Sequence, residues 1–180
     1  MTSLISKIKV IAIILIMMVA FSFVSNAQDN QMQALIGQSL SKLQQPTPEA
    51  FLTCIAELKR IEAMYPENIE PKYQLVLQSL NFSVINPHAE QTEELLAHAE
   101  QTISKMEQMK RSDTSNIYAL KGFLYMVRIV QDPTINGRRY YIDVMQNFEK
   151  SLKINPENTL AKQLQQKFYD GMKSFQNADR

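Results

Sequence analysis

Cysteine and glycine are scarce in this 180-residue chain, which has one cysteine and four glycines. A single cysteine, Cys54, cannot form an intramolecular disulfide, so it is either buried or paired with another chain. Its apolar neighbours Phe51, Leu52 and Ile55 favour burial. Four glycines leave little room for the glycine-rich loops that cradle phosphates. A disulfide-stapled fold and a phosphate-cradling loop are therefore disfavoured.

Catalytic and metal-binding motifs are missing as well. The sequence contains no nucleophile elbow and no Cys–His arrangement. The two histidines, His88 and His98, are ten residues apart and share no ligand spacing on a helix. Glu94 and His98 are four residues apart, but no third ligand lies nearby, and zinc sites use three or four. We expect no enzyme activity, no cofactor and no metal, and interpret these residues as a solvated face.

The beginning of the chain differs from the rest. Two lysines precede a mostly apolar run over residues 10–24, which is shorter than the roughly 20 residues of a membrane-spanning helix. Small residues at Ser25 and Ala27 suit a signal peptidase. This pattern predicts a signal peptide over residues 1–27 with cleavage before Gln28. The alternative is an N-terminal anchor that is not cleaved.

The predicted mature chain, residues 28–180, is long enough for one domain with its own core. Cleavage would remove two of the 19 basic residues and none of the 18 acidic residues, which leaves a formal charge of −1. That balance disfavours nucleic acid as a partner. No cysteine follows the apolar run, so lipid attachment is not supported. We expect an exported protein, periplasmic or secreted, without a membrane span after cleavage.

Helix-favouring residues and apolar spacings of three and four dominate residues 28–180, and no strand is evident. The pattern predicts an all-α domain. We expect seven helices: one that ends at Gln45; one from Pro48, capped by Thr47; one from about Glu70 to Asn86; one from about Glu90 to Arg111; one over Ile117–Val130; one marked by Tyr140–Leu152; and one from about Thr159 to Phe175. The helix over Ile117–Val130 is apolar on nearly every side, which predicts a central position.

A candidate binding site follows the segment 131–137, which is predicted to be the longest loop. Arg138, Arg139 and Tyr140 lie next to it, and arginine and tyrosine are residue types that protein interfaces favour. We therefore predict that these three residues bind a protein partner. The alternative interpretation places Tyr141 in the core, with Tyr140 partly covering it and both arginines in water.

The chain also resembles itself. A shift of 45 residues superposes Leu58, Ile103 and Phe148, and twice that shift carries Pro-Glu-Asn at 66–68 onto Pro-Glu-Asn at 156–158. The shift predicts three antiparallel helix pairs followed by a C-terminal capping helix. Stacked pairs of this kind bury a continuous core that one pair cannot bury alone. A seven-helix bundle without repeats is the alternative.

The third pair resembles the tetratricopeptide-repeat family. Tyr118, Gly122 and Tyr125 match the large, glycine and aromatic positions of its first helix, and Phe148 and Pro156 match the aromatic and closing-proline positions of its second. The resemblance implies a right-handed stack of antiparallel pairs in which glycine lets two helices approach and aromatic residues fill the groove between repeats. It also implies a concave face that binds protein or peptide.

Several positions depart from that family. The span from Gly122 to Phe148 is about ten residues longer than a roughly 34-residue repeat allows, and periods of about 40–47 residues are those of HEAT and armadillo arrays. Lys121 replaces the usual apolar residue, and Ser151 replaces the usual alanine.

The leading segment and the Ile-Asn-Pro-Glu-Asn run at 154–158 also resemble small exported proteins of Bacteroidetes-type bacteria.

The pattern as a whole favours a non-catalytic, exported module that binds a protein or peptide. Two alternatives remain: a helical bundle with an apolar small-molecule pocket, and a purely structural envelope protein. Abundant methionine, tyrosine and phenylalanine, with 10, 7 and 8 residues, suit the pocket, but no acid–base pair accompanies them.

Overall fold

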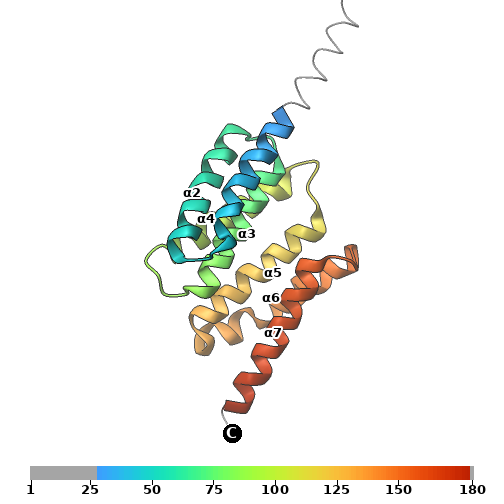
Figure 1. Cartoon of the computed structure of the whole chain (residues 1–180). Helices are drawn as coiled ribbons and strands as arrows, with labels where there is room; N and C mark the ends of the chain where they lie inside the picture. The colour runs from blue at the N-terminus through green and yellow to red at the C-terminus, as the bar shows by residue number, and fades with distance from the viewer. Residues whose placement is uncertain (1–27, 179–180) are drawn as a thin grey trace, which may run out of the picture.

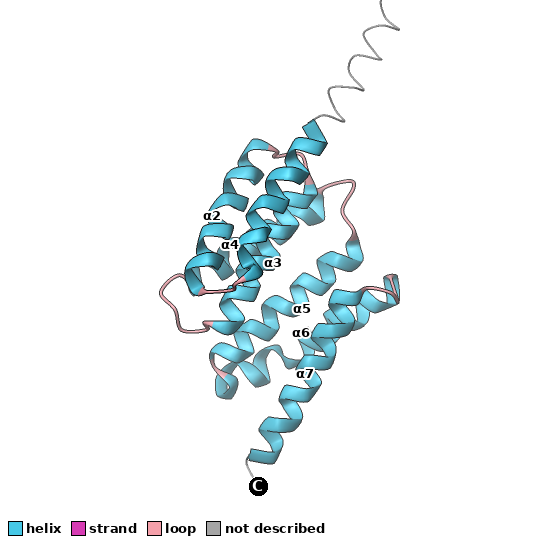
Figure 2. Ribbon diagram, viewed as in Figure 1, coloured by secondary structure: helices cyan, strands magenta, loops and turns pink. Residues whose placement is uncertain are grey.

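The computed structural model describes residues 28–178, and its regular elements are all helical (Figure 1). A helical segment over residues 28–41 leads into the short 3-10 helix η1 (Lys42–Gln44). The α-helices that follow are α2 (Pro48–Met64), α3 (Ile69–Ile85), α4 (Thr92–Gln108), α5 (Thr114–Gln131), α6 (Pro133–Ile154) and α7 (Thr159–Ala178). Figure 2 shows no strand in the described chain. The predicted all-α class is confirmed.

The predicted signal peptide, residues 1–27, lies outside the described residues. Over residues 28–178, no helix combines the length and the apolar character needed to cross a membrane.

Local capping chemistry sets two of the helix starts. The Thr47 hydroxyl accepts a hydrogen bond from the Ala50 amide at 3.2 Å, and Pro48 occupies the first turn of α2. The Asp113 carboxylate accepts the Ser115 amide at 2.9 Å at the start of α5. These bonds satisfy amides that a helix start leaves without partners. The start of α2 confirms the sequence prediction, whereas α5 begins at Thr114, three residues before the predicted Ile117.

The predicted loop over residues 131–137 is wrong. Helix α5 ends at Gln131 and α6 begins at Pro133, with Asp132 as the one residue between them. The Asp132 carboxylate accepts the Ile135 amide at 3.0 Å and caps α6. An acidic cap followed by proline starts a helix for the physical reason that applies at the start of α2: proline has no amide hydrogen to satisfy.

The surplus residues of the third pair are therefore helical. Helix α6 has 22 residues and α5 has 18, whereas α2, α3 and α4 have 17 each. The Asn136 side-chain amide donates to the Arg128 carbonyl oxygen at 2.7 Å and so ties the first turns of α6 to the end of α5. Helix α4, by contrast, is shorter than predicted, because it spans only Thr92–Gln108.

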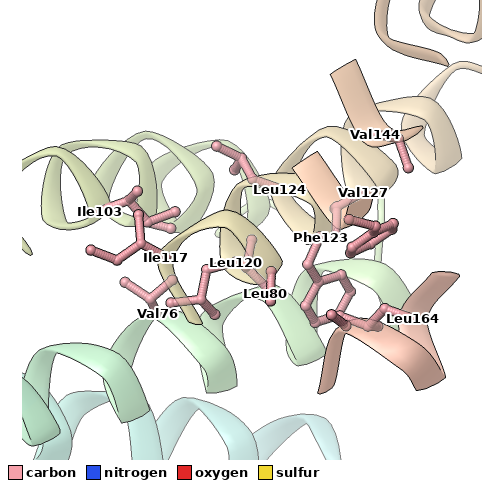
Figure 3. Close-up of a cluster of buried hydrophobic side chains, with 14 of the residues drawn as sticks. Val76, Leu80, Ile103, Ile117, Leu120, Phe123, Leu124, Val127, Val144 and Leu164 are labelled. Atoms are coloured by element: carbon pink, nitrogen blue, oxygen red, sulfur yellow. The ribbon is translucent and has the colours of Figure 1, made fainter. Parts of the chain in front are cut away.

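Helix α5 occupies the centre of the fold, as predicted. It packs against α3, α4, α6 and α7. In Figure 3 its fully buried Leu120 lies among side chains from other helices, including Val76 of α3 and Ile103 of α4. Val144 of α6 and Leu164 of α7 belong to the same cluster. Burial of each such side chain contributes about 1.5–3 kcal/mol, so contacts to α5 bind the C-terminal half together.

A second apolar cluster joins the segment 28–41 to α2 and α3. It contains Met32, Cys54 and Leu58, and Cys54 has no exposed surface, which confirms its predicted burial. Helix α3 contributes to both clusters, with Leu75 in this one and Val76 in the other. Figure 1 accordingly shows α2, α3 and α4 grouped at one end and α5, α6 and α7 at the other.

Alternate helices start at a regular interval. Helices α3, α5 and α7 begin at Ile69, Thr114 and Thr159, each 45 residues after the last. This interval equals the shift found in the sequence. Helix α3 also contacts α5, and α5 contacts α7, in addition to the contacts between consecutive helices.

Candidate functional site

Two tyrosines line a groove of about 410 Å³ between α4, α5 and α6, called here the aromatic groove. The rings of Tyr125 on α5 and Tyr140 on α6 stack with centroids 5.4 Å apart and planes inclined by 21°. The guanidinium carbon of Arg139 lies 5.0 Å from the centroid of the Tyr140 ring. A cation at this distance is attracted by the electron-rich ring face. The groove thus has an aromatic wall beside a positive charge.

An ion-pair network bounds the same groove. One guanidinium nitrogen of Arg128 lies 2.7 and 2.9 Å from the two carboxylate oxygens of Glu93, and the Gln131 amide donates to Glu93 at 2.6 Å. The hydrogen bonds from Arg128 and Gln131 hold the pKa of the Glu93 carboxyl below its usual range. The Glu93 side chain is 68% exposed, so this pair positions Arg128 and adds little stability.

Helix α4 presents acidic residues to α5 at intervals of seven. Glu93 meets Arg128, and Glu107 pairs with Lys121, whose ammonium lies 2.5 Å from its carboxylate. The contact with Glu107 gives the charge of Lys121 a partner on α4. Glu100, between these two, lines the aromatic groove, and its carboxylate has no hydrogen bond or ion pair within residues 28–178.

Burial and nearby carboxylates act on the Tyr125 hydroxyl. Burial raises the pKa of Tyr125 most, and the negative charges of Asp143 and Glu100 raise it further. Tyr125 therefore stays neutral at physiological pH and presents an O–H donor to the groove. Glu100 offers acceptor oxygens, and Arg139 offers N–H donors. Aromatic faces with donors and acceptors of this kind suit the polar backbone and mixed side chains of a polypeptide.

The predicted site residues separate in the structure. Arg139 and Tyr140 line the aromatic groove, while Arg138 is exposed and lies outside its lining. Tyr141 is 40% exposed and packs against Phe168 of α7, with centroids 5.6 Å apart. The interpretation that placed Tyr141 in the core is wrong, because its side chain is exposed. The same interpretation placed Arg138 and Arg139 in water, and both are exposed.

Sequence reasoning missed the groove residues on the other two helices. Tyr125 matches only a packing position of the repeat pattern, and no sequence motif groups Arg128 with Glu93 and Glu100. The seven-residue spacing of the glutamates on α4 was a usable signal. The pairing across α4 and α5 spans 35 residues, which no local pattern specifies.

His88 and His98 were weighed in the sequence as candidate metal ligands. His88 is exposed, and His98 is half-buried with Nδ1 3.4 Å from the Thr102 hydroxyl. Burial lowers the pKa of His98 most, followed by the charge of Lys59. Across the described part of the chain, no three histidine, cysteine, aspartate or glutamate side chains gather as metal ligands would.

Comparison of the chain with protein-family models, curated proteins and solved structures gave no match.

Proposed function

We propose that this chain is a non-catalytic, exported helical-repeat protein that binds another protein or a peptide in the aromatic groove. The stacked pair of Tyr125 and Tyr140 beside Arg139 carries the proposal. Tyrosine and arginine dominate the binding energy of protein interfaces, because they bury a large area and form directed hydrogen bonds. Here they line one groove, on helices that the core holds in place.

The proposal assigns the chain to a tetratricopeptide-like stack of helix pairs. The 45-residue interval between helix starts and the contacts of α5 with α3 and α7 support that arrangement. Stacks of helix pairs bind partners over extended surfaces, so a groove that crosses three helices suits this class. The signal-peptide pattern in the sequence supports export to the periplasm or the outside of the cell.

The partner's chemistry follows from the groups in the groove. An acidic side chain or a C-terminal carboxylate of the partner would bind Arg139, because a guanidinium donates two parallel hydrogen bonds to a carboxylate. A neighbouring donor would bind Glu100, whose carboxylate oxygens form no hydrogen bond or ion pair with the described side chains of residues 28–173. An extended segment that carries both groups would bring its apolar atoms onto the tyrosine rings.

Site-specific photocrosslinking tests the proposal. A benzophenone amino acid replaces Tyr140 in one sample and Gln146, an exposed residue farther along α6, in the other. Irradiation in the producing cells should yield one dominant crosslinked protein from position 140 and not from position 146. Equal products at both positions, or none at position 140, would refute the groove as an interface.

Adjacent arginines provide a matched pair of variants for the identified partner. Arg139→Ala should weaken binding by about 1–3 kcal/mol, as loss of an interface anchor does. Arg138→Ala removes the same charge one residue away, outside the groove, and should change the affinity by less than about 0.5 kcal/mol. Equal losses would indicate general electrostatic attraction rather than binding in the groove. Isothermal titration calorimetry measures both.

A further inference from the structure

A second groove, of about 200 Å³, lies between the end of α5, the start of α6 and the second half of α7. It is called here the apolar groove, and it shares no lining residue with the aromatic groove. Its apolar side chains are Met126, Ile129, Val130, Pro133, Phe168 and Met172. Val130 remains 36% exposed, so water reaches apolar surface here. An apolar ligand that covers this surface removes it from water, which favours binding.

Two glycines keep this groove open. Gly137 on α6 and Gly171 on α7 both line it, and a Cβ atom added at either would meet no atom within 4 Å. Glycine within a helix costs about 1 kcal/mol relative to alanine. Both positions therefore have space for a side chain that the sequence does not supply.

The charge at the groove has one sign. Among the described residues, Lys167 is the one charged residue in its lining, and none of the described lining residues is acidic. Lys167 is exposed, and within residues 28–178 its ammonium forms no ion pair. A ligand that placed an anion beside Lys167 and an apolar chain in the groove would satisfy both features.

We propose that the apolar groove binds a free fatty acid, with its carboxylate beside Lys167 and its chain between α5, α6 and α7. The volume is below the roughly 300–1,000 Å³ of sites for drug-sized ligands, which favours one narrow chain over a ring system or a two-chain lipid. Met126 and Met172 are flexible and polarizable, so they adapt to a chain that has no fixed shape. This site is independent of the proposed peptide groove.

Titration of the purified chain with decanoate, below its micelle concentration, tests the site. Carbon-13 labelled methionine methyl groups give the readout. The signals of Met126 and Met172 should shift with saturation, while that of Met32, buried in the other apolar cluster, should not. Absence of any saturable shift at Met126 and Met172 would overturn the proposal.

Groove-filling variants test the location. Gly171→Leu should weaken decanoate binding by roughly tenfold or more, because the new side chain takes the place of the ligand's apolar contacts. Gly37→Leu is the matched control, since Gly37 is also helical and a Cβ there also meets nothing within 4 Å, but it lies outside the groove. Thermal unfolding verifies that both variants fold. Unchanged affinity in folded Gly171→Leu would refute the location.

The head group is tested separately. Lys167→Met should weaken decanoate binding several-fold and leave decanol binding unchanged, because it removes only the charge. Lys167→Arg should keep decanoate binding, because it keeps the charge. Equal affinity of the wild type for decanol and decanoate would overturn the carboxylate assignment. Binding to anionic phospholipid vesicles without binding of decanoate would assign the surface to a membrane and reject the free fatty acid.

Discussion

Gly122 on α5 lies directly against the ring of Phe148 on α6. A Cβ atom added to Gly122 would lie 2.6 Å from Cε1 and 2.8 Å from Cδ1 of that ring. Phe148 has no exposed surface, so its ring has no free volume into which to move. Helices α5 and α6 therefore approach each other at a position where only glycine fits.

Gly122→Ala should destabilise the fold. Alanine gains about 1 kcal/mol in helix propensity over glycine, but overpacking a well-packed core costs about 1–3 kcal/mol. The contact of 2.6 Å with a buried ring makes the second effect the larger one. We expect a net loss of roughly 1 kcal/mol in the free energy of unfolding, measured by urea denaturation.

Gly37→Ala provides the control for this substitution. A Cβ at Gly37 meets no atom within 4 Å, so the helix-propensity gain should remain and raise the unfolding free energy by about 0.5–1 kcal/mol. The double variant Gly122→Ala/Phe148→Leu should lose less than the sum of its parts, because the smaller side chain makes room. If Gly122→Ala were as stabilising as Gly37→Ala, the close approach would be refuted.

Some helix ends, such as the start of α2, were predictable from the sequence because their causes are local. Thr47 and Asp113 cap the helices that follow them, and prolines interrupt the chain near the predicted places. The central position of α5 was also predictable, since apolar residues around a whole helix require burial on every side. Asp132 with Pro133 carried the same start signal, although residues 131–137 were predicted to form a loop.

The aromatic groove was only half predictable. Arg139 and Tyr140 are adjacent in the sequence, and their residue types indicated an interface. Tyr125 and Glu93 join them through the packing of α5 on α4 and α6, which depends on helix lengths and approach distances. The apolar groove includes the open space at Gly171. The space between helices is known only once their packing is known, so the sequence alone could not predict this groove.

A buried polar cluster joins the ends of three helices. The Ser115 hydroxyl donates to the Ser151 carbonyl oxygen at 2.9 Å, and the Ser151 hydroxyl donates to the Ser115 carbonyl oxygen at 2.8 Å. The Asn158 amide donates to the Ser115 hydroxyl at 2.8 Å, and its oxygen accepts the Ala161 amide at 3.0 Å. Asn158 therefore links the start of α7 to α5 and caps α7 at the same time.

Asn158→Ala should lower the free energy of unfolding by about 2 kcal/mol, because it removes a helix cap worth about 1 kcal/mol and leaves a buried hydroxyl with fewer partners. Asn68→Ala is the matched control. Asn68 stands 90 residues earlier in the equivalent Pro-Glu-Asn, and its side chain makes no capping bond. It should cost less than about 0.5 kcal/mol. Equal losses in chemical denaturation would contradict the role assigned to Asn158.

Lys72 is a buried cation that holds the turn between α2 and α3. Its side chain is 5% exposed, and its ammonium donates to the Pro66 carbonyl oxygen at 2.5 Å and lies 3.4 Å from the Glu62 carboxylate. Lys72→Met keeps the apolar stem and removes these donors, so we expect a loss of about 1–3 kcal/mol. Lys162→Met, at the equivalent position in α7, removes the ammonium of a side chain that is 49% exposed, so the free energy of unfolding should change little. An unchanged free energy of unfolding in Lys72→Met would show that water replaces these contacts.

The Cys54 thiol should make stability depend on pH in the alkaline range. Burial, and secondarily the Glu57 carboxylate, raise the pKa of Cys54 from 9.0 to about 11, while Lys42 opposes them. The unfolded thiol ionises near pH 9 and the folded thiol near pH 11, so stability is lost as pH rises between these values, by about 1.4 kcal/mol per pH unit. The unfolding free energy of the wild type should therefore fall relative to Cys54→Ala from pH 9 to 11, while tyrosine ionisation affects both alike. Parallel pH curves, or rapid alkylation of Cys54 in the folded chain at pH 8, would contradict its burial.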